Sequence, residues 1–176
     1  MEKKRRKRED LEDGDDEIQL VSFKLGTETF AVNVDQVREI GKVERITKVP
    51  RMPDFIEGVM NLRGQITTII DLRNRFRIAG DGGRTSQSRV IVAEIGEIQV
   101  GIIVDSVHDV IRVPARSLSP PPKTFTTNID ARFLTGICKQ PDILIMLIDL
   151  TTLLGIDEVG QISNITDDLM GSQGAS

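Results

Sequence analysis

The sequence predicts a mainly all-β fold, in which two small β-barrels pack together and carry a few short helices. Short runs of β-branched and aromatic residues recur along the chain with turn residues between them, a pattern typical of small barrels and sandwiches. The same order of runs occurs twice, which indicates two copies of one module. Each copy ends in an Asp that precedes a short apolar segment, as expected of a capped helix.

The two copies align without gaps in two blocks. Residues 20–40 match residues 90–110, and residues 55–76 match residues 133–154. The extra residues of the second copy lie between these blocks, where three consecutive prolines occur at 120–122. Positions that are identical in the two copies include Gly26 and Gly96, Asp35 and Asp105, Phe55 and Phe133, Gly58 and Gly136, and Asp71 and Asp149.

Each copy begins with a predicted β-hairpin. In the first copy its strands are residues 18–25 and 29–34, and Gly26 between them can adopt the positive φ of a tight connection. The corresponding hairpin of the second copy lies within residues 89–104. Apolar residues then occur at every third position of 34–40, which predicts a short helical turn or an irregular strand exit.

A second hairpin follows in each copy. Residues 58–62 and 65–70 form it in the first copy, and the turn consists of Arg63 and Gly64. In the second copy it lies within residues 136–148, with a proline at the turn. The intervening stretch 42–49 is a candidate for a further strand, and Asp71 and Asp149 are expected to cap the short helices.

These patterns divide the chain into five expected parts. They are a disordered charged tail at 1–17, a first barrel module at 18–79, a linker at 80–88, a second barrel module at 89–155, and a flexible tail at 156–176. Within the last part, Val159, Ile162, Ile165 and Leu169 are spaced to line one face of a frayed helix.

The composition argues against several classes of protein. The chain has no Trp, no Tyr and a formal net charge of −4, which disfavours a surface that stacks nucleic-acid bases. No apolar run approaches the roughly 20 residues of a membrane-spanning helix. One cysteine and the lack of an apolar export signal favour the cytoplasm. With one His and one Cys, no metal site is expected.

Two functional alternatives rest on other residues. A hydrolase would depend on His108 and Asp105, although no nucleophile elbow is present and a surface position suits His108 better. A nucleic-acid binder would use the basic runs at 3–8 and 73–77, but acidic residues directly follow the first run. For Arg63, a solvated turn residue and a partner contact are both open readings.

Several motifs, in order, resemble the CheW-like family of chemotaxis coupling proteins. They are Asn61-Leu62-Arg63-Gly64 with Ile66 to Phe76, the segment from Phe30 to Ile40, Val104 to Val110, and Leu134 to Ile137 followed by Ile145 to Leu150. The resemblance covers about 18–155. The same domain occurs in the kinase CheA and in CheV, but this chain has no room for a kinase or receiver domain, so a standalone coupler is favoured.

The resemblance implies a fold of two small five-stranded SH3-like β-barrels around a shared hydrophobic centre. It also implies a non-enzymatic adaptor that couples the cytoplasmic tips of chemoreceptors to the regulatory domain of the histidine kinase CheA. No cofactor, nucleic acid or direct membrane insertion is implied, and the protein is expected in the cytoplasm, recruited to membrane-associated receptor arrays. A coupler of a related array that does not control motility is the alternative.

The resemblance further implies a receptor-binding surface. Family contact positions carry over to Val37, Glu39, Gly58 and Arg63. A receptor tip is a helical hairpin, and a helix docks into an apolar groove rimmed by charge. In this arrangement Val37 and Ile40 form groove wall, Glu39 and Arg63 fix the orientation, and Gly64 displays Arg63 to solvent.

Overall fold

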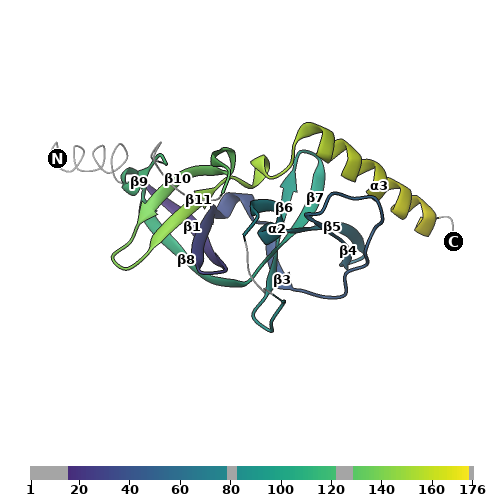
Figure 1. The fold of residues 1–176 in the computed structure, drawn as a ribbon, viewed down its shortest axis with the longest axis horizontal. Helices are drawn as coiled ribbons and strands as arrows, with labels where there is room; N and C mark the ends of the chain where they lie inside the picture. The colour runs from purple at the N-terminus through teal and green to yellow at the C-terminus, as the bar shows by residue number, and fades with distance from the viewer. Residues whose placement is uncertain (1–15, 79–82, 122–128, 175–176) are drawn as a thin grey trace, which may run out of the picture.

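The computed structural model describes residues 16–78, 83–121 and 129–174. It contains two β-sheets, a short helix between them and a long C-terminal helix (Figure 1). The strands and helices are β1 Glu17–Leu25, β2 Glu28–Asn33, β3 Glu39–Lys42, β4 Ile56–Leu62, β5 Gln65–Asp71, α2 Leu72–Phe76, β6 Arg89–Ile95, β7 Ile98–Val104, β8 Ser106–Pro114, β9 Leu118–Ser119, β10 Leu134–Lys139, β11 Leu144–Ile148 and α3 Ile156–Gly174. Single 3₁₀ turns occur at Val34–Gln36, Ala115–Ser117, Ala131–Phe133 and Leu150–Thr152.

The predicted hairpins and caps are confirmed. β1 pairs with β2, β4 with β5, β6 with β7 and β10 with β11, all antiparallel. Asp71 accepts hydrogen bonds from the backbone N–H groups of Arg73 and Asn74 at the start of α2, and Asp149 accepts one from Thr151. The candidate strand at 42–49 is reduced to one bridge, between Thr47 and Val59.

The internal repeat is confirmed by the pairing registers. In one sheet Val21 of β1 lies opposite Val110 of β8, and in the other Ile91 of β6 lies opposite Ile40 of β3. These four positions are the ones that the repeat places in correspondence. The two copies therefore share backbone geometry as well as sequence.

The prediction that each copy forms its own barrel is wrong. The sheet orders are β8-β1-β2-β11-β10-β9, called sheet A here, and β3-β6-β7-β5-β4, called sheet B. Each sheet joins the first hairpin of one copy to the second hairpin of the other, through the parallel pairs β2–β11 and β5–β7. A repeat shows which strands are equivalent but not which copy each strand joins, so the boundaries 18–79 and 89–155 do not delimit the sheets.

The sheets are SH3-like in strand arrangement but are not closed barrels. In the described part of the chain, no hydrogen-bonded ladder joins the two edge strands of either sheet. Sheet A has six strands because the short β9 adds to its β10 edge, where sheet B has only the Thr47–Val59 bridge.

The hydrophobic core has three parts. One cluster fills sheet A and includes Leu20 and Cys138, and another fills sheet B and includes Met60 and Ile69. The largest cluster lies between the sheets and draws on both of them, on α2 and on α3. Four phenylalanines contact one another in series through it, in the order Phe23, Phe30, Phe76 and Phe133. Burial in this shared core binds the two sheets together.

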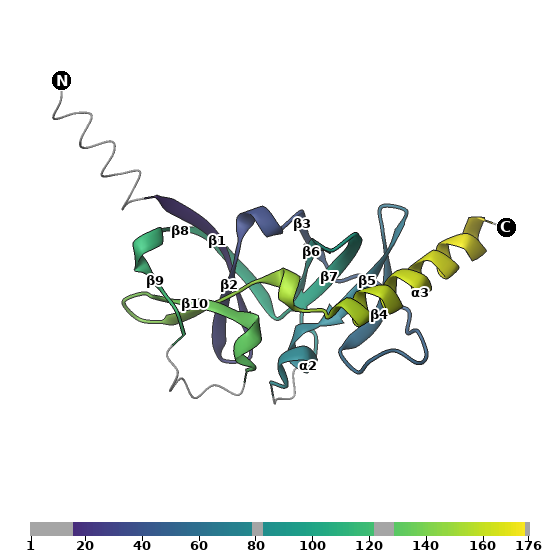
Figure 2. The same cartoon turned by 90° about the horizontal axis from the view of Figure 1, so that it is seen from above.

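The C-terminal segment is more ordered than the flexible tail expected from sequence. It forms α3, which crosses sheet B beside β5 (Figure 2). Ile162 is buried in the shared core, which gives the helix an apolar anchor. Residues 1–15 of the tail expected at 1–17, residues 80–82 of the linker expected at 80–88, and Pro122 lie outside the described residues.

Candidate functional site

The turn between β4 and β5 displays Arg63. Arg63 and Gly64 have φ values of 52° and 81°, the pair of positive angles that a two-residue hairpin turn requires. The side chain of Asn61 accepts a hydrogen bond from the Gly64 N–H at 2.8 Å and so fixes the turn. The Arg63 side chain is 82% exposed at the tip.

Glu39 and Arg63 meet in space. Glu39 lies at the start of β3, the edge strand of sheet B, and its backbone pairs with Val92 of β6. Its Oε2 atom is 3.2 Å from Nη2 of Arg63, so the pair links the strand to the turn. Glu39 and Arg63, two positions at which the resemblance implies receptor binding, therefore form an ion pair.

Ile40 and Val37 have different surroundings. Ile40 is 40% exposed, one of the large apolar side chains on the described surface. Val37 is half-buried and packs against the shared core, and its N–H donates to the Val34 carbonyl. The structure thus brings Glu39, Ile40 and Arg63 to the surface of sheet B, whereas Val37 packs mainly as support.

Gly58 is buried and makes a close backbone approach possible. It lies at a bulge in β4 with φ 148°, and a Cβ atom there would be 2.2 Å from the Thr47 carbonyl oxygen. The Thr47 segment is held beside Gly58 by two backbone hydrogen bonds of 2.8 Å that Thr47 exchanges with Val59. Gly58 therefore shapes the site through the backbone and presents no surface of its own.

A small groove adjoins the turn. Its volume is about 270 Å³, and it is lined by Arg45, Thr47, Val59, Met60, Asn61 and Ile66. The groove combines an apolar floor with polar side chains at its rim, the surface that a helix with an apolar face can enter. Sequence reasoning missed Arg45 and Thr47, and the candidate strand at 42–49 was the only signal for them.

The acidic caps are structural. Burial raises the pKa of the Asp71 carboxyl. The hydrogen bonds from the N–H groups of Arg73 and Asn74 lower this pKa, but burial outweighs them. At Asp149 burial also raises the pKa, but hydrogen bonds from Thr151 and Gln36 outweigh it and the net pKa is lowered. The Gln36 amide donates to Asp149 at 2.7 Å, so this cap also joins the two halves of the chain.

The residues of the hydrolase alternative do not come together. Asp105 accepts a hydrogen bond of 2.7 Å from the Gly26 N–H and pairs with Arg73. His108 is exposed on β8, where its Nε2 is 3.2 Å from the Ser106 hydroxyl. Among the described residues, no group of three potential metal ligands is present. No described helix is long and apolar enough to cross a membrane.

Comparison with known proteins gives one consistent family. Residues 19–158 match the family model of the CheW-like domain. The chain is similar to "Chemotaxis protein CheW" of Klebsiella aerogenes, at 36% identity over 81% of this chain and 85% of the relative. It is similar to the protein of that name in Bacillus subtilis, at 33% identity over 77% and 85% of the two chains.

A solved structure agrees with the sequence relatives. The scaffolding protein TtCheW of Thermoanaerobacter tengcongensis is 41% identical, with a TM-score of 0.73, over 80% of this chain and 90% of that chain. That structure is named a scaffolding protein and the relatives are named chemotaxis proteins, and none of these is the name of an enzyme. This chain belongs to the CheW-like domain family.

Proposed function

We propose that the chain is a non-enzymatic adaptor of a chemotaxis array, which couples the cytoplasmic tips of chemoreceptors to the regulatory domain of the histidine kinase CheA. The observation that carries the proposal is the Glu39–Arg63 pair beside exposed Ile40. An anion and a cation placed together beside an apolar contact fix the direction in which a helical partner lies. The adjacent groove can receive an apolar side chain of that partner.

The repeat supports a protein with two partners. In the second copy, the positions of Glu39, Ile40 and Arg63 are held by Asp109, Val110 and Pro141. Val110 is 52% exposed on β8. The two copies therefore place two surfaces at corresponding positions of the fold, and the second surface lacks the arginine of the first. Two surfaces of different chemistry suit an adaptor that bridges two different proteins.

The test is a co-sedimentation of the chain with purified receptor tips and with the kinase. The Arg63→Glu variant places two like charges beside each other and is expected to lose the receptor tip while keeping the kinase. Arg77→Glu is the matched control, because Arg77 is also exposed and lies at the end of α2. Binding of neither partner by the wild-type chain would refute the proposal. In cells we expect the protein on the cytoplasmic side, recruited to membrane-associated receptor arrays.

A further inference from the structure

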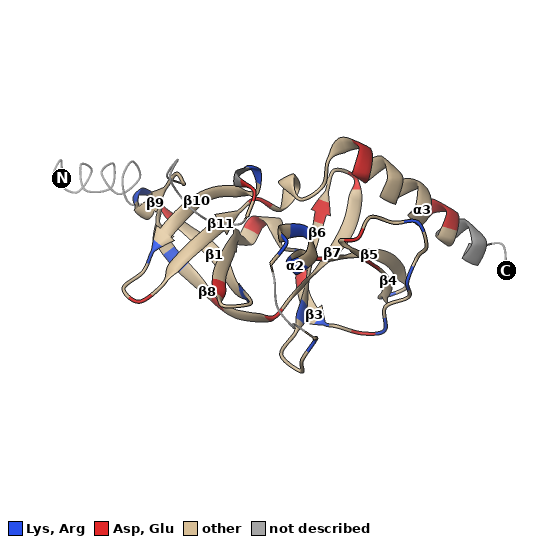
Figure 3. Cartoon of the chain, in the orientation of Figure 1, with Lys and Arg blue, Asp and Glu red and all other residues tan. Residues whose placement is uncertain are grey.

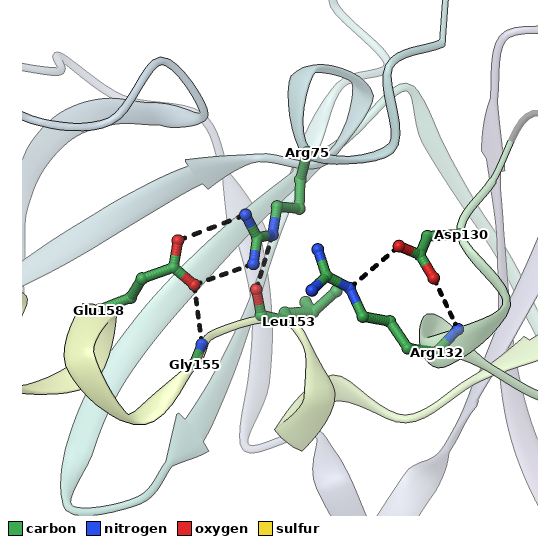
Figure 4. Close-up of polar contacts among 6 residues, drawn as sticks. All are labelled: Arg75, Asp130, Arg132, Leu153, Gly155 and Glu158. Carbon is green, nitrogen blue, oxygen red and sulfur yellow. Dashed lines mark hydrogen bonds and ion pairs between the residues drawn. The ribbon is translucent and has the colours of Figure 1, made fainter.

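Arg75 lies where the two halves of the chain and the C-terminal helix meet. It is part of α2, yet its Nε donates to the carbonyl of Leu153 at 2.8 Å. Its two terminal nitrogens donate to the carboxylate of Glu158 at 2.9 and 3.3 Å (Figure 4). Only 13% of the Arg75 side chain is exposed. All three nitrogens of this guanidinium are therefore engaged by residues of the second half.

Two aromatic rings flank the same guanidinium. Its central carbon lies 4.1 Å from the ring centre of Phe55 and 5.3 Å from that of Phe133. Phe55 and Phe133 correspond in the repeat, and so do Arg75 and Leu153. One arginine thus lies between equivalent rings of the two copies and breaks their symmetry, because the second copy has Leu at this position.

The first turn of α3 is built around this arginine. Glu158 Oε1 also accepts the Gly155 N–H at 2.7 Å, so one carboxylate caps the helix and pairs with Arg75. The helix has no Lys or Arg, and its acidic residues appear in red along it in Figure 3. Arg75 forms a bidentate ion pair with its N-terminal turn, and such a pair is strong and directional where it is shielded from water.

Beyond its first turn, α3 packs on the shared core mainly through Ile162 and the half-buried Val159. Of its side chains described through Leu169, Ile162 alone is fully buried, and Ile156 is 91% exposed. The Thr166 hydroxyl is 3.5 Å from that of Thr68 on β5. By contrast, β5 pairs with β4 on one side and with β7 on the other through hydrogen-bonded ladders. Elements with little apolar burial open at lower free energy than core strands.

We propose that α3 is a detachable clasp, which leaves sheet B as a unit while both sheets stay folded, and that Arg75 is the positioning residue that keeps it docked. Arg75 binds the first turn of α3, and Ile162 anchors the helix in the shared core. Detachment frees α3 and exposes the part of the shared core that Ile162 covers. This inference concerns the chain alone and does not depend on which proteins bind it.

The test is native-state hydrogen exchange on the full-length chain. In Arg75→Met, backbone amides of 162–168 should exchange at least about tenfold faster, because a shielded pair leaves an unpaired carboxylate when one partner is removed. Amides of β5 and β7 should change by less than about threefold. Arg77→Met is the matched control on the same short segment and should leave both sets unchanged.

Glu158→Gln tests the clasp from the helix side and keeps the chain testable if Arg75→Met folds poorly. It retains a hydrogen-bond acceptor but removes the charge, so it should accelerate exchange in α3 without affecting the sheets. Equal acceleration in α3, β5 and β7 would overturn the proposal, since the helix would then open only with the whole fold. Unchanged α3 exchange in both variants would overturn the role of Arg75.

Discussion

The carboxylate of Glu39 lies 3.2 Å from the guanidinium of Arg63, and the two residues come from opposite edges of sheet B. β3 and β4 are these edges, so the pair spans the opening that a closed barrel would seal with hydrogen bonds. The Arg63 side chain is mostly in solvent, and exposed pairs contribute little to folding. The ion pair is therefore expected to add little to stability, which leaves both side chains available for the receptor contact that we propose.

Glu39→Gln separates these two roles. The loss in free energy of unfolding should be below about 1 kcal/mol, because exposed ion pairs rarely contribute more. Receptor-tip affinity should fall, since Arg63 loses the carboxylate that orients it. Urea denaturation and a direct binding titration on the same samples measure the two effects. A large stability loss with unchanged affinity would show that the pair is structural.

Gly58→Ala should destabilise the fold strongly. The new Cβ would be 2.2 Å from the Thr47 carbonyl oxygen, and φ 148° is unfavourable for Ala. We expect a loss of about 2–4 kcal/mol, from backbone strain together with the broken Thr47–Val59 bridge. Gly41→Ala is the control, because nothing lies within 4 Å of its Cβ position. Urea midpoints of the two variants should differ clearly, and equal midpoints would contradict this account of Gly58.

Ile162→Ala should destabilise the protein more than Ile156→Ala. Ile162 is 1% exposed in the shared core, and removing it leaves a cavity that costs about 2–4 kcal/mol. Ile156 is the first residue of α3 and is 91% exposed, so its truncation should cost less than about 0.5 kcal/mol. Thermal unfolding of the two variants checks the difference. Similar losses in the free energy of unfolding would contradict the burial of Ile162 in the shared core.

Asp71 and Asp149 should respond to pH in opposite ways. Burial raises the pKa of Asp71, so its favourable contribution is full below its unfolded pKa and is lost as pH rises through the folded value. The pKa of Asp149 is lowered by hydrogen bonds that outweigh its burial, so its contribution is present above the unfolded pKa and is lost as pH falls through the folded value.

The measurement compares each Asp→Asn variant with the wild type by urea denaturation between about pH 3 and pH 6. Relative to its variant, the wild type should lose stability with rising pH at Asp71 and gain it at Asp149. Asn can also cap a helix, so both variants should fold. A change in relative stability with pH that has the same sign at both positions would contradict the environments described for Asp71 and Asp149.

The local structure could be predicted from the sequence because its determinants are local. Gly26, Gly64 and Gly96 have the positive φ values that their turns require, and Asp71 and Asp149 cap the segments that follow them. Strand exchange between the copies could not be predicted. The repeat makes both pairings look alike, and the parallel ladders β2–β11 and β5–β7 depend on packing between distant segments.

The site was partly predictable for the same reason. Arg63 and Gly64 follow from a turn pattern, whereas the contact of Arg63 with Glu39 depends on how sheet B bends. Gly58 was selected as a contact position, but its identity reflects the approach of Thr47. The sequence marks Arg75 only as one of the basic residues at 73–77, since its partners Phe133 and Glu158 come from the other half of the chain.

The most direct test of the adaptor proposal is a three-component co-sedimentation of receptor tips, the kinase CheA and this chain. Wild type should bring the kinase into the receptor pellet, and Arg63→Glu should leave the kinase and the chain bound to each other in the supernatant. Arg77→Glu should behave as wild type. If Arg63→Glu still carries the kinase to the receptor as well as wild type does, the Glu39–Arg63 surface is not the receptor contact, and if wild type carries none, the chain is not a coupler of these two proteins.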